Sequence, residues 1–103
     1  MHAVLNALAD PHRRAIIDML DDGERPANDF VAALPIAQPT VSRHLAVLKQ
    51  AGLVQVRVDG NRRLYRLQPA PLQEVDAWLG RYRRFWSQRL DALEAHLDEE
   101  LPQ

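Results

Sequence analysis

The fold of this chain is decided by the stretch Gln38-Pro-Thr-Val-Ser-Arg-His-Leu-Ala-Val-Leu-Lys-Gln-Ala-Gly-Leu-Val54. Pro39 suits the first turn of a helix, where its missing N–H costs nothing. Val41, Leu45 and Leu48 then recur at helical spacing and define one apolar face. Gly52 marks the end of the helix. The stretch therefore predicts a helix over about 38–51 that buries one face and exposes the other.

Three shorter helices are expected before this stretch. The first covers 2–9. The second begins at Pro11, with Asp10 as its N-cap, and closes at Gly23. Pro26 opens the third helix, which ends near Pro35. The segment 34–39 is then a tight turn between two helices, as in a helix-turn-helix.

The pattern changes after Gly52. Leu53 to Val58 alternates apolar and polar residues with the period of a strand. Asp59-Gly60-Asn61 is a strong hairpin signal, and 63–67 is the returning strand. One long helix is expected from about Pro71 to Glu99.

These elements predict a mainly α fold with a β-hairpin wing: a winged helix-turn-helix of four helices, two strands and a final helix. The length of 103 residues favours a single domain over 1–103. Its DNA-reading core would cover about 10–67. Two outer helices, over about 2–9 and 71–99, would serve dimerisation.

Charge is distributed unevenly along the chain. Residues 1–37 carry three Arg and six acidic residues, and 67–103 carry four Arg and seven acidic residues. The central segment 38–66 instead holds five Arg and one Lys against Asp59 alone. A localised basic segment can meet phosphates even though the whole chain has a net charge of −1. DNA is therefore the predicted partner of residues 38–66.

The outer face of the 38–51 helix supplies the predicted base contacts. Arg43 projects nearly opposite the buried face, and the N-terminal residues of a recognition helix meet base edges. The predicted base-reading residues are Gln38, Thr40, Ser42, Arg43 and His44, although His44 lies at the shoulder of this face and has packing or capping as an equal alternative. The predicted backbone contacts of the wing are Arg57, Asn61, Arg62 and Arg63. For Arg13 and Arg14, phosphate contact and a surface salt bridge to Asp10 or Asp18 are equally favoured.

The final helix carries a near-heptad apolar stripe. A face some 25 residues long exceeds what one small domain needs, so a partner chain is the economical explanation. The residues expected at the dimer interface are Val4, Leu5, Leu8, Leu72, Val75, Leu79, Tyr82, Trp86, Leu90 and Leu93. The cluster of Trp78, Tyr82, Phe85 and Trp86 is more readily interface core than a ligand pocket.

Three segments resemble the ArsR-type family of bacterial repressors. They are the stretch 38–54, Leu8-Ala-Asp-Pro-His-Arg-Arg-Ala-Ile-Ile17, and the wing Arg57-Val-Asp-Gly-Asn-Arg-Arg-Leu-Tyr65. The resemblance implies a homodimeric repressor that binds a near-palindromic operator and dimerises through its first and last helices. Repression of its own gene is one alternative for its target.

The family's metal ligands do not carry over to this chain. Pro26-Ala-Asn-Asp-Phe30 lacks the cysteine pair of the third helix, and the sequence contains no cysteine at all. Asp76-Ala-Trp78 lacks the first histidine of the other metal site. His96-Leu-Asp-Glu99 lies too far along the last helix. No metal or other cofactor is therefore expected, and a His2–His96 metal site is a weak alternative.

We do not expect an enzyme, because the chain has no Gly-rich phosphate loop, HExxH or GxSxG motif. It also lacks a long apolar run for a membrane span and a secretory signal at its N-terminus, so we expect a cytoplasmic protein. Two alternatives to the plain repressor stay open. One is a repressor of the same fold gated by a metal or a small molecule, and the other is a winged-helix module that docks another protein. The effector, if any, is not specified by the sequence.

Overall fold

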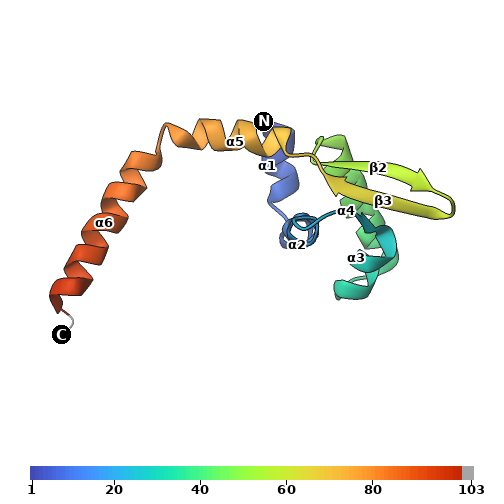
Figure 1. The fold of residues 1–103 in the computed structure, drawn as a ribbon, viewed down its shortest axis with the longest axis horizontal. Coiled ribbons are helices and arrows are strands. Elements are labelled where there is room, and N and C mark those ends of the chain that lie inside the picture. The colour runs from blue at the N-terminus through green and yellow to red at the C-terminus, as the bar shows by residue number, and fades with distance from the viewer. Residues whose placement is uncertain (101–103) are drawn as a thin grey trace. The chain divides into compact units, whose positions relative to one another are not determined.

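The structure is a computed structural model that describes the backbone of residues 1–100 and the side chains of residues 1–99 (Figure 1). The chain forms two compact units. The first extends from Met1 to Gln73, and the second begins at Glu74. The first unit contains the whole segment predicted to contact DNA.

Four helices of the first unit match the sequence prediction. They are α1 (His2–Leu8), α2 (Pro11–Met19), α3 (Ala27–Ala33) and α4 (Gln38–Gln50). Pro26 precedes α3 as its N-cap and does not start the helix itself. The predicted helix-turn-helix is thus formed by α3 and α4, which are joined by residues 34–37.

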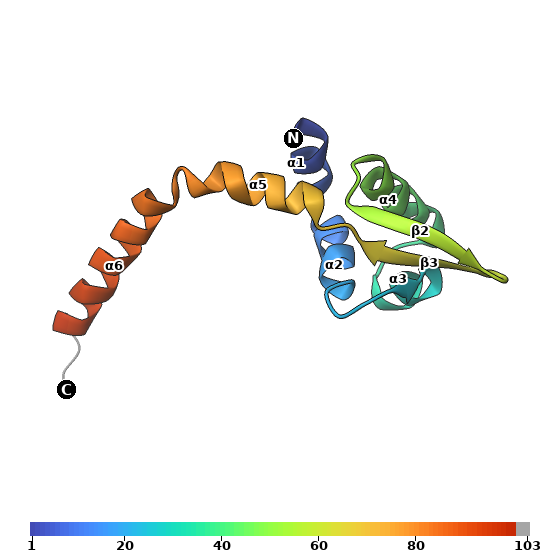
Figure 2. The same ribbon diagram turned by 45° about the horizontal axis from the view of Figure 1, so that its top comes forward.

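The hairpin of the first unit consists of β2 (Val54–Asp59) and β3 (Arg62–Leu67), paired antiparallel with Val56 opposite Tyr65. A two-residue turn joins them, and its first residue, Gly60, has φ +61°, which only glycine adopts without strain. A third strand that the sequence analysis did not predict, β1 (Arg25–Pro26), pairs with β3 and gives the sheet order β1-β3-β2. Two residues are too few to show the alternation of a strand. The hairpin turn projects beyond the helices (Figures 1 and 2).

The core of the first unit lies between the helices and the sheet. Phe30 of α3 meets Tyr65 of β3 edge to face, with ring centroids 6.2 Å apart. The other apolar side chains that are less than a tenth exposed are Val4, Ala7, Ile16, Leu20, Val41, Leu45, Leu48, Leu53, Val54 and Leu64. The predicted inward stripe of α4 is confirmed, so the opposite face of that helix is turned to solvent.

Two local motifs fix the ends of the helices around α4. The Asp10 carboxylate accepts hydrogen bonds from the backbone N–H groups of His12 (2.8 Å) and Arg13 (3.1 Å), which caps α2. At the end of α4, Gly52 has φ +78°, and the N–H of Leu53 reaches back to the Leu48 carbonyl at 3.0 Å. This is a Schellman motif, and it directs the chain from α4 into β2.

The C-terminal segment forms two helices, so the expectation of one long helix is wrong. The structure has α5 (Ala70–Gly80) and α6 (Arg83–Glu100), separated by Arg81 and Tyr82. Hydrogen bonds there connect residues three apart, such as Tyr82 N–H to the Leu79 carbonyl at 2.9 Å. Glycine has the greatest backbone freedom and weakens a helix, which explains why the break follows Gly80.

Candidate nucleic-acid interface

The outer face of α4 presents a row of polar side chains from its N-terminal half. Gln38, Ser42 and Arg43 are exposed, and Thr40 is half-buried. The Arg43 guanidinium donates a long hydrogen bond of 3.5 Å to Thr40 Oγ1. Four of the five predicted base-reading residues therefore lie on the accessible side of one helix, within reach of a ligand that approaches its N-terminal half.

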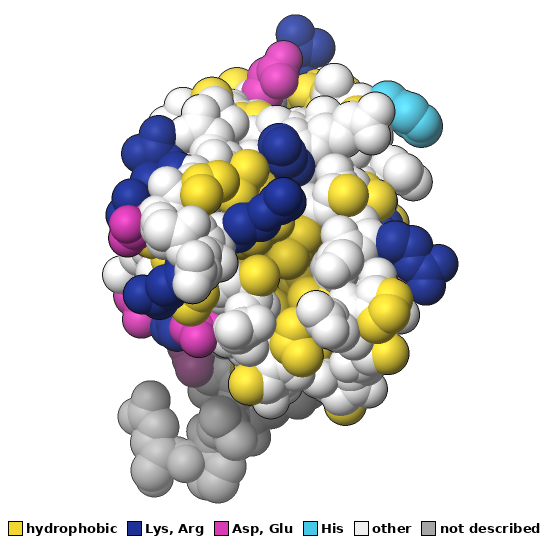
Figure 3. Space-filling model, turned by 90° about the vertical axis from the view of Figure 1, so that its right-hand side faces the viewer, with side chains coloured by type: hydrophobic (Ala, Val, Ile, Leu, Met, Phe, Trp, Pro, Cys, Tyr) yellow, Lys and Arg dark blue, Asp and Glu magenta, His cyan; other side chains and the backbone are white. Residues whose placement is uncertain are grey.

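A groove runs between α4 and the sheet and brings the wing next to this face. Gln38 and Ser42 of α4 line it from one side and Arg63 of β3 from the other, with Lys49 further along α4. Val56 and Tyr65 form part of its lining. Viewed from the side of the wing, the first unit shows lysine and arginine side chains around an apolar hollow (Figure 3). The structure thus joins two segments that the sequence places about 20 residues apart.

The tip of the wing carries Asn61, Arg62 and Arg63, all of them exposed. Within residues 1–99, neither arginine side chain has a carboxylate partner, hydrogen bond or ring contact. These three residues also border a hollow beside Asn28 at the start of α3. The two guanidinium groups are therefore available to an anionic ligand.

Arg57 is placed differently from the other wing arginines. Its guanidinium donates to the Glu24 carboxylate at 2.8, 2.9 and 3.1 Å. This pairing lowers the pKa of Glu24 and raises the pKa of Arg57. The structure thus pairs the Arg57 charge with the segment before β1 and does not bring it to the wing tip.

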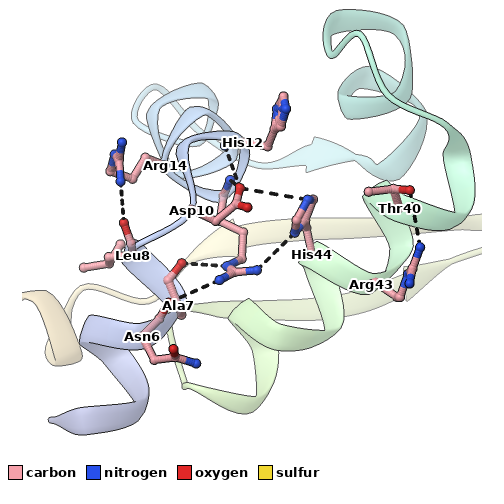
Figure 4. Close-up of polar contacts among 10 residues, drawn as sticks. Asn6, Ala7, Leu8, Asp10, His12, Arg14, Thr40, Arg43 and His44 are labelled. Atoms are coloured by element: carbon pink, nitrogen blue, oxygen red, sulfur yellow. Dashed lines mark hydrogen bonds and ion pairs between the residues drawn. The ribbon is translucent and has the colours of Figure 1, made fainter.

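His44 also stands apart from the outer face of α4, because its side chain is only 13% exposed. Its ring points toward the N-terminus of α2 (Figure 4). Nδ1 lies 3.2 Å from an Arg13 guanidinium nitrogen, and Nε2 lies 3.9 Å from the Asp10 carboxylate. Of the two alternatives for His44, the geometry favours packing.

Arg13 and Arg14 are both bound to carbonyl groups at the end of α1 (Figure 4). Arg13 donates to the carbonyls of Ala7 (2.6 Å) and Asn6 (3.2 Å), and Arg14 donates to that of Leu8 (2.8 Å). Such carbonyls have no partner within their own helix. Capping of a neighbouring helix was neither of the two roles expected from the sequence, because it depends on how α1 and α2 pack.

The predicted interface residues fall into two groups. Val4 is 6% exposed and already covered within one chain, whereas Leu5 is 41% exposed. Leu8, Leu72 and Val75 are half-buried. In the second unit the large apolar side chains are between 36% and 59% exposed: Trp78, Leu79, Tyr82, Phe85, Trp86, Leu90, Leu93 and Leu97. Trp78 and Phe85 flank Tyr82, with ring centroids 5.8 and 6.5 Å from its own.

The described residues contain neither a metal-binding cluster nor a membrane-spanning helix. No group of three or more His, Asp or Glu side chains lies close enough there to hold a metal ion. None of the helices in that part of the chain has the length and apolar character needed to cross a bilayer.

Comparisons with known proteins agree on one family. A family model described as "Bacterial regulatory protein, arsR family" matches residues 10–56. The HTH-type transcriptional regulator Rv2034 of Mycobacterium tuberculosis is 40% identical over 94 residues, which cover 91% of this chain and 85% of that protein. The transcriptional repressor SdpR of Bacillus subtilis is 35% identical over 79 residues, covering 77% and 88% of the two chains.

A solved structure extends the similarity to the fold. The ArsR-like transcriptional regulator from Rhodococcus sp. RHA1 superposes with a TM-score of 0.70 at 29% sequence identity. The match covers 91% of this chain and 89% of that one.

The helix-turn-helix of α3 and α4, followed by a hairpin with an arginine-bearing tip, defines a winged helix-turn-helix DNA-binding protein. Its relatives are transcriptional regulators and not enzymes, as the sequence analysis predicted. The chain belongs to the ArsR family of bacterial transcriptional regulators.

Proposed function

We propose that this protein is a homodimeric repressor that binds a near-palindromic DNA operator in the cytoplasm, with α4 in the major groove and the wing on the backbone or in the minor groove. The observation that carries this proposal is the joint surface of α4 and the wing. It combines exposed polar side chains at the start of a helix with two arginines that have no acidic partner among the described residues. That combination suits recognition of both bases and phosphates.

Base contacts are assigned to the accessible face of α4. Arg43 can bind guanine through two hydrogen bonds, and Gln38 can bind adenine in the same way. Thr40 and Ser42 carry hydroxyl groups that can meet base edges or phosphates. All four belong to the first six residues of α4, the part of a recognition helix that enters the groove first.

Backbone contacts are assigned to Asn61, Arg62 and Arg63. Their position at a projecting turn suits a phosphate chain that runs beside the groove occupied by α4. Because the Glu24 carboxylate already neutralises Arg57, we expect Arg57 to contribute less to DNA affinity than the other two arginines.

Dimerisation is assigned to the apolar side chains of α5 and α6, together with Leu5 of α1. On α6, Trp86, Leu90, Leu93 and Leu97 share one helical face, and each is more than 40% exposed. The helix has 18 residues and is therefore ~27 Å long. A second copy of the same face would cover this stripe in a two-fold symmetric pair. Such a dimer presents two copies of α4 to one DNA duplex.

Selection of bound duplexes from a random pool tests the proposal. We expect one motif with two inverted half-sites spaced by roughly 10 base pairs, or one helical turn. Affinity for the selected duplex should fall steeply as salt concentration rises. A pool that yields no motif, with binding no tighter than to unrelated DNA, contradicts the proposal and favours the protein-docking alternative.

A further inference from the structure

Three elements meet at a polar junction formed by Asp10, Arg13 and His44 (Figure 4). Asp10 caps α2, and Arg13 extends from α2 to the carbonyls at the end of α1 and to His44 of α4. His44 is the residue through which α4 takes part. The junction lies one residue along the helix from Arg43, on the side away from the outer face of α4.

The hydrogen bond to Arg13 specifies the protonation state of His44. A guanidinium group only donates hydrogen bonds, so Nδ1 of His44, 3.2 Å from it, has to accept. The imidazole is then neutral and carries its proton on Nε2, the nitrogen 3.9 Å from the Asp10 carboxylate. A proton added to Nδ1 would place one N–H group against another and one cation beside a second.

The surroundings of His44 both raise and lower its pKa. Burial lowers the pKa of His44, the Asp10 carboxylate raises it, and Arg13, His12 and Arg43 lower it, so the net result lies below the ordinary value of 6.5. His12 is the nearest other histidine, with ring centroids 6.1 Å apart. The pKa of Asp10 is also low: burial opposes ionisation, but the backbone N–H groups of Arg13 and His12 and the nearby cations favour it more. A carboxylate therefore persists beside His44 throughout the range in which histidine titrates.

We propose that His44 is a positioning residue for the recognition helix, and that protonation of its imidazole breaks the link to Arg13 and weakens DNA binding. The proposal rests on the proposed DNA-binding function. In neutral solution the link sets α4 against α2 and, through Arg13, against α1. In acid the link to Arg13 is lost, and α4 keeps only its apolar face and the longer contact between His44 and Asp10.

The direction of the pH effect separates this role from direct DNA contact. If His44 touched a phosphate, its added positive charge would strengthen binding as the pH falls. A positioning role gives the opposite sign. Because the folded-state pKa of His44 is depressed, its contribution to stability is complete above pH 6.5 and declines as the pH falls below that value toward the folded-state pKa.

The test measures affinity for the selected operator duplex at pH 7.5 and pH 5.5, at constant ionic strength, with the full chain. We expect the wild-type protein to bind more weakly at the lower pH, with a loss that reaches at most about tenfold when His44 is fully protonated, the effect of one hydrogen bond to a charged group. His44→Gln keeps an acceptor for Arg13 but does not titrate, so its affinity should vary much less with pH. His2→Gln, which removes an exposed histidine at the start of α1, is the matched control and should keep the wild-type profile. Wild-type affinity that is unchanged or higher at pH 5.5, or an equal loss in His44→Gln, overturns the proposal.

A second measurement on the wild-type protein needs neither a variant nor DNA. The imidazole resonances of His44, followed by NMR between pH 8 and pH 4.5, should titrate below 6.5. They should start from the tautomer with the proton on Nε2. A His44 pKa at or above 6.5, or a proton on Nδ1, contradicts the proposed role of His44. This holds even if His44→Gln does not fold. A protein that fails to bind any selected duplex at pH 7.5 contradicts the proposed function instead, and the NMR titration still decides the junction.

Discussion

The arginines of this protein have different roles, which depend on the groups that their side chains contact. Arg13, Arg14 and Arg25 each donate to a carbonyl near the end of a preceding helix, Arg25 to that of Met19 at 2.6 Å. Arg57 is bound to a carboxylate. Arg43, Arg62 and Arg63 remain on the surface with no acidic partner among the described residues. The chemistry of the guanidinium is the same in all cases, so its surroundings decide between a structural and a binding role.

Arg43 and Arg62 should differ in how their loss affects DNA recognition. Arg43→Ala should relax the base preference at one position of the half-site, at a cost of about 1–3 kcal/mol for the preferred base. Arg62→Ala should weaken binding about equally for all sequences. Affinities for the selected operator and for its single-base variants check both results. Equal relaxation by the two substitutions would contradict the assignment of α4 to bases and the wing to phosphates.

Arg57 offers a test of charge pairing. A protein loses about one unit of salt dependence for each phosphate contact removed. We therefore expect Arg62→Ala to reduce the slope of log affinity against log salt by about one, and Arg57→Ala to leave it nearly unchanged. The comparison is matched, because both substitutions remove one arginine from the same hairpin. An equal reduction for Arg57→Ala would show that DNA displaces Glu24 and recruits this arginine.

At the scale of elements, the ends of helices and strands determine where α4 and the wing point. Gly52 reverses the chain after α4 and starts β2. Gly60 allows the two-residue turn at the tip of the wing with φ +61°. An added Cβ at Gly60 would meet no atom within 4 Å, so any cost of substitution there comes from the backbone conformation.

Gly60→Ala should therefore destabilise the protein by about 1 kcal/mol, since an L-residue is strained at this φ. Gly60→Asn is the control, because asparagine tolerates positive φ better and should cost less. Urea unfolding of the two variants gives the comparison. If alanine and asparagine have the same midpoint as wild type, the turn does not keep this conformation in solution.

At the scale of the whole molecule, the second unit has large apolar side chains that stay 36–59% exposed in the described single chain. Its stripe on α6 is far larger than the scattered apolar residues that are normal on a soluble surface. Recognition of an inverted repeat requires two copies of α4. In the proposed dimer, the same association that covers the stripe on α6 also supplies the second copy of α4.

Leu90→Asp should convert the protein to a monomer, because a carboxylate at a buried apolar contact is costly. The substitution should also reduce operator affinity by far more than tenfold, since each half-site alone binds weakly. Ala95→Asp is the matched control on the opposite face of α6 and should remain dimeric. Light scattering at micromolar concentration measures both variants. A wild-type protein that is monomeric under these conditions contradicts the dimer.

The helix-turn-helix and the wing were predictable from the sequence alone, because local signals govern them: helical spacing in 38–51, strand alternation in 53–58, and glycine at 52 and 60. The basic segment and the exposed face of α4 were predictable in the same way. Which charges find a partner within the chain depends instead on tertiary packing. Glu24 is 33 residues from Arg57, and Arg13 is 31 residues from His44, and no local pattern encodes contacts at such separations. The break after Gly80 was missed for a related reason: a continuous apolar stripe fits one helix or two, and only the backbone of residues 81–82 distinguishes them.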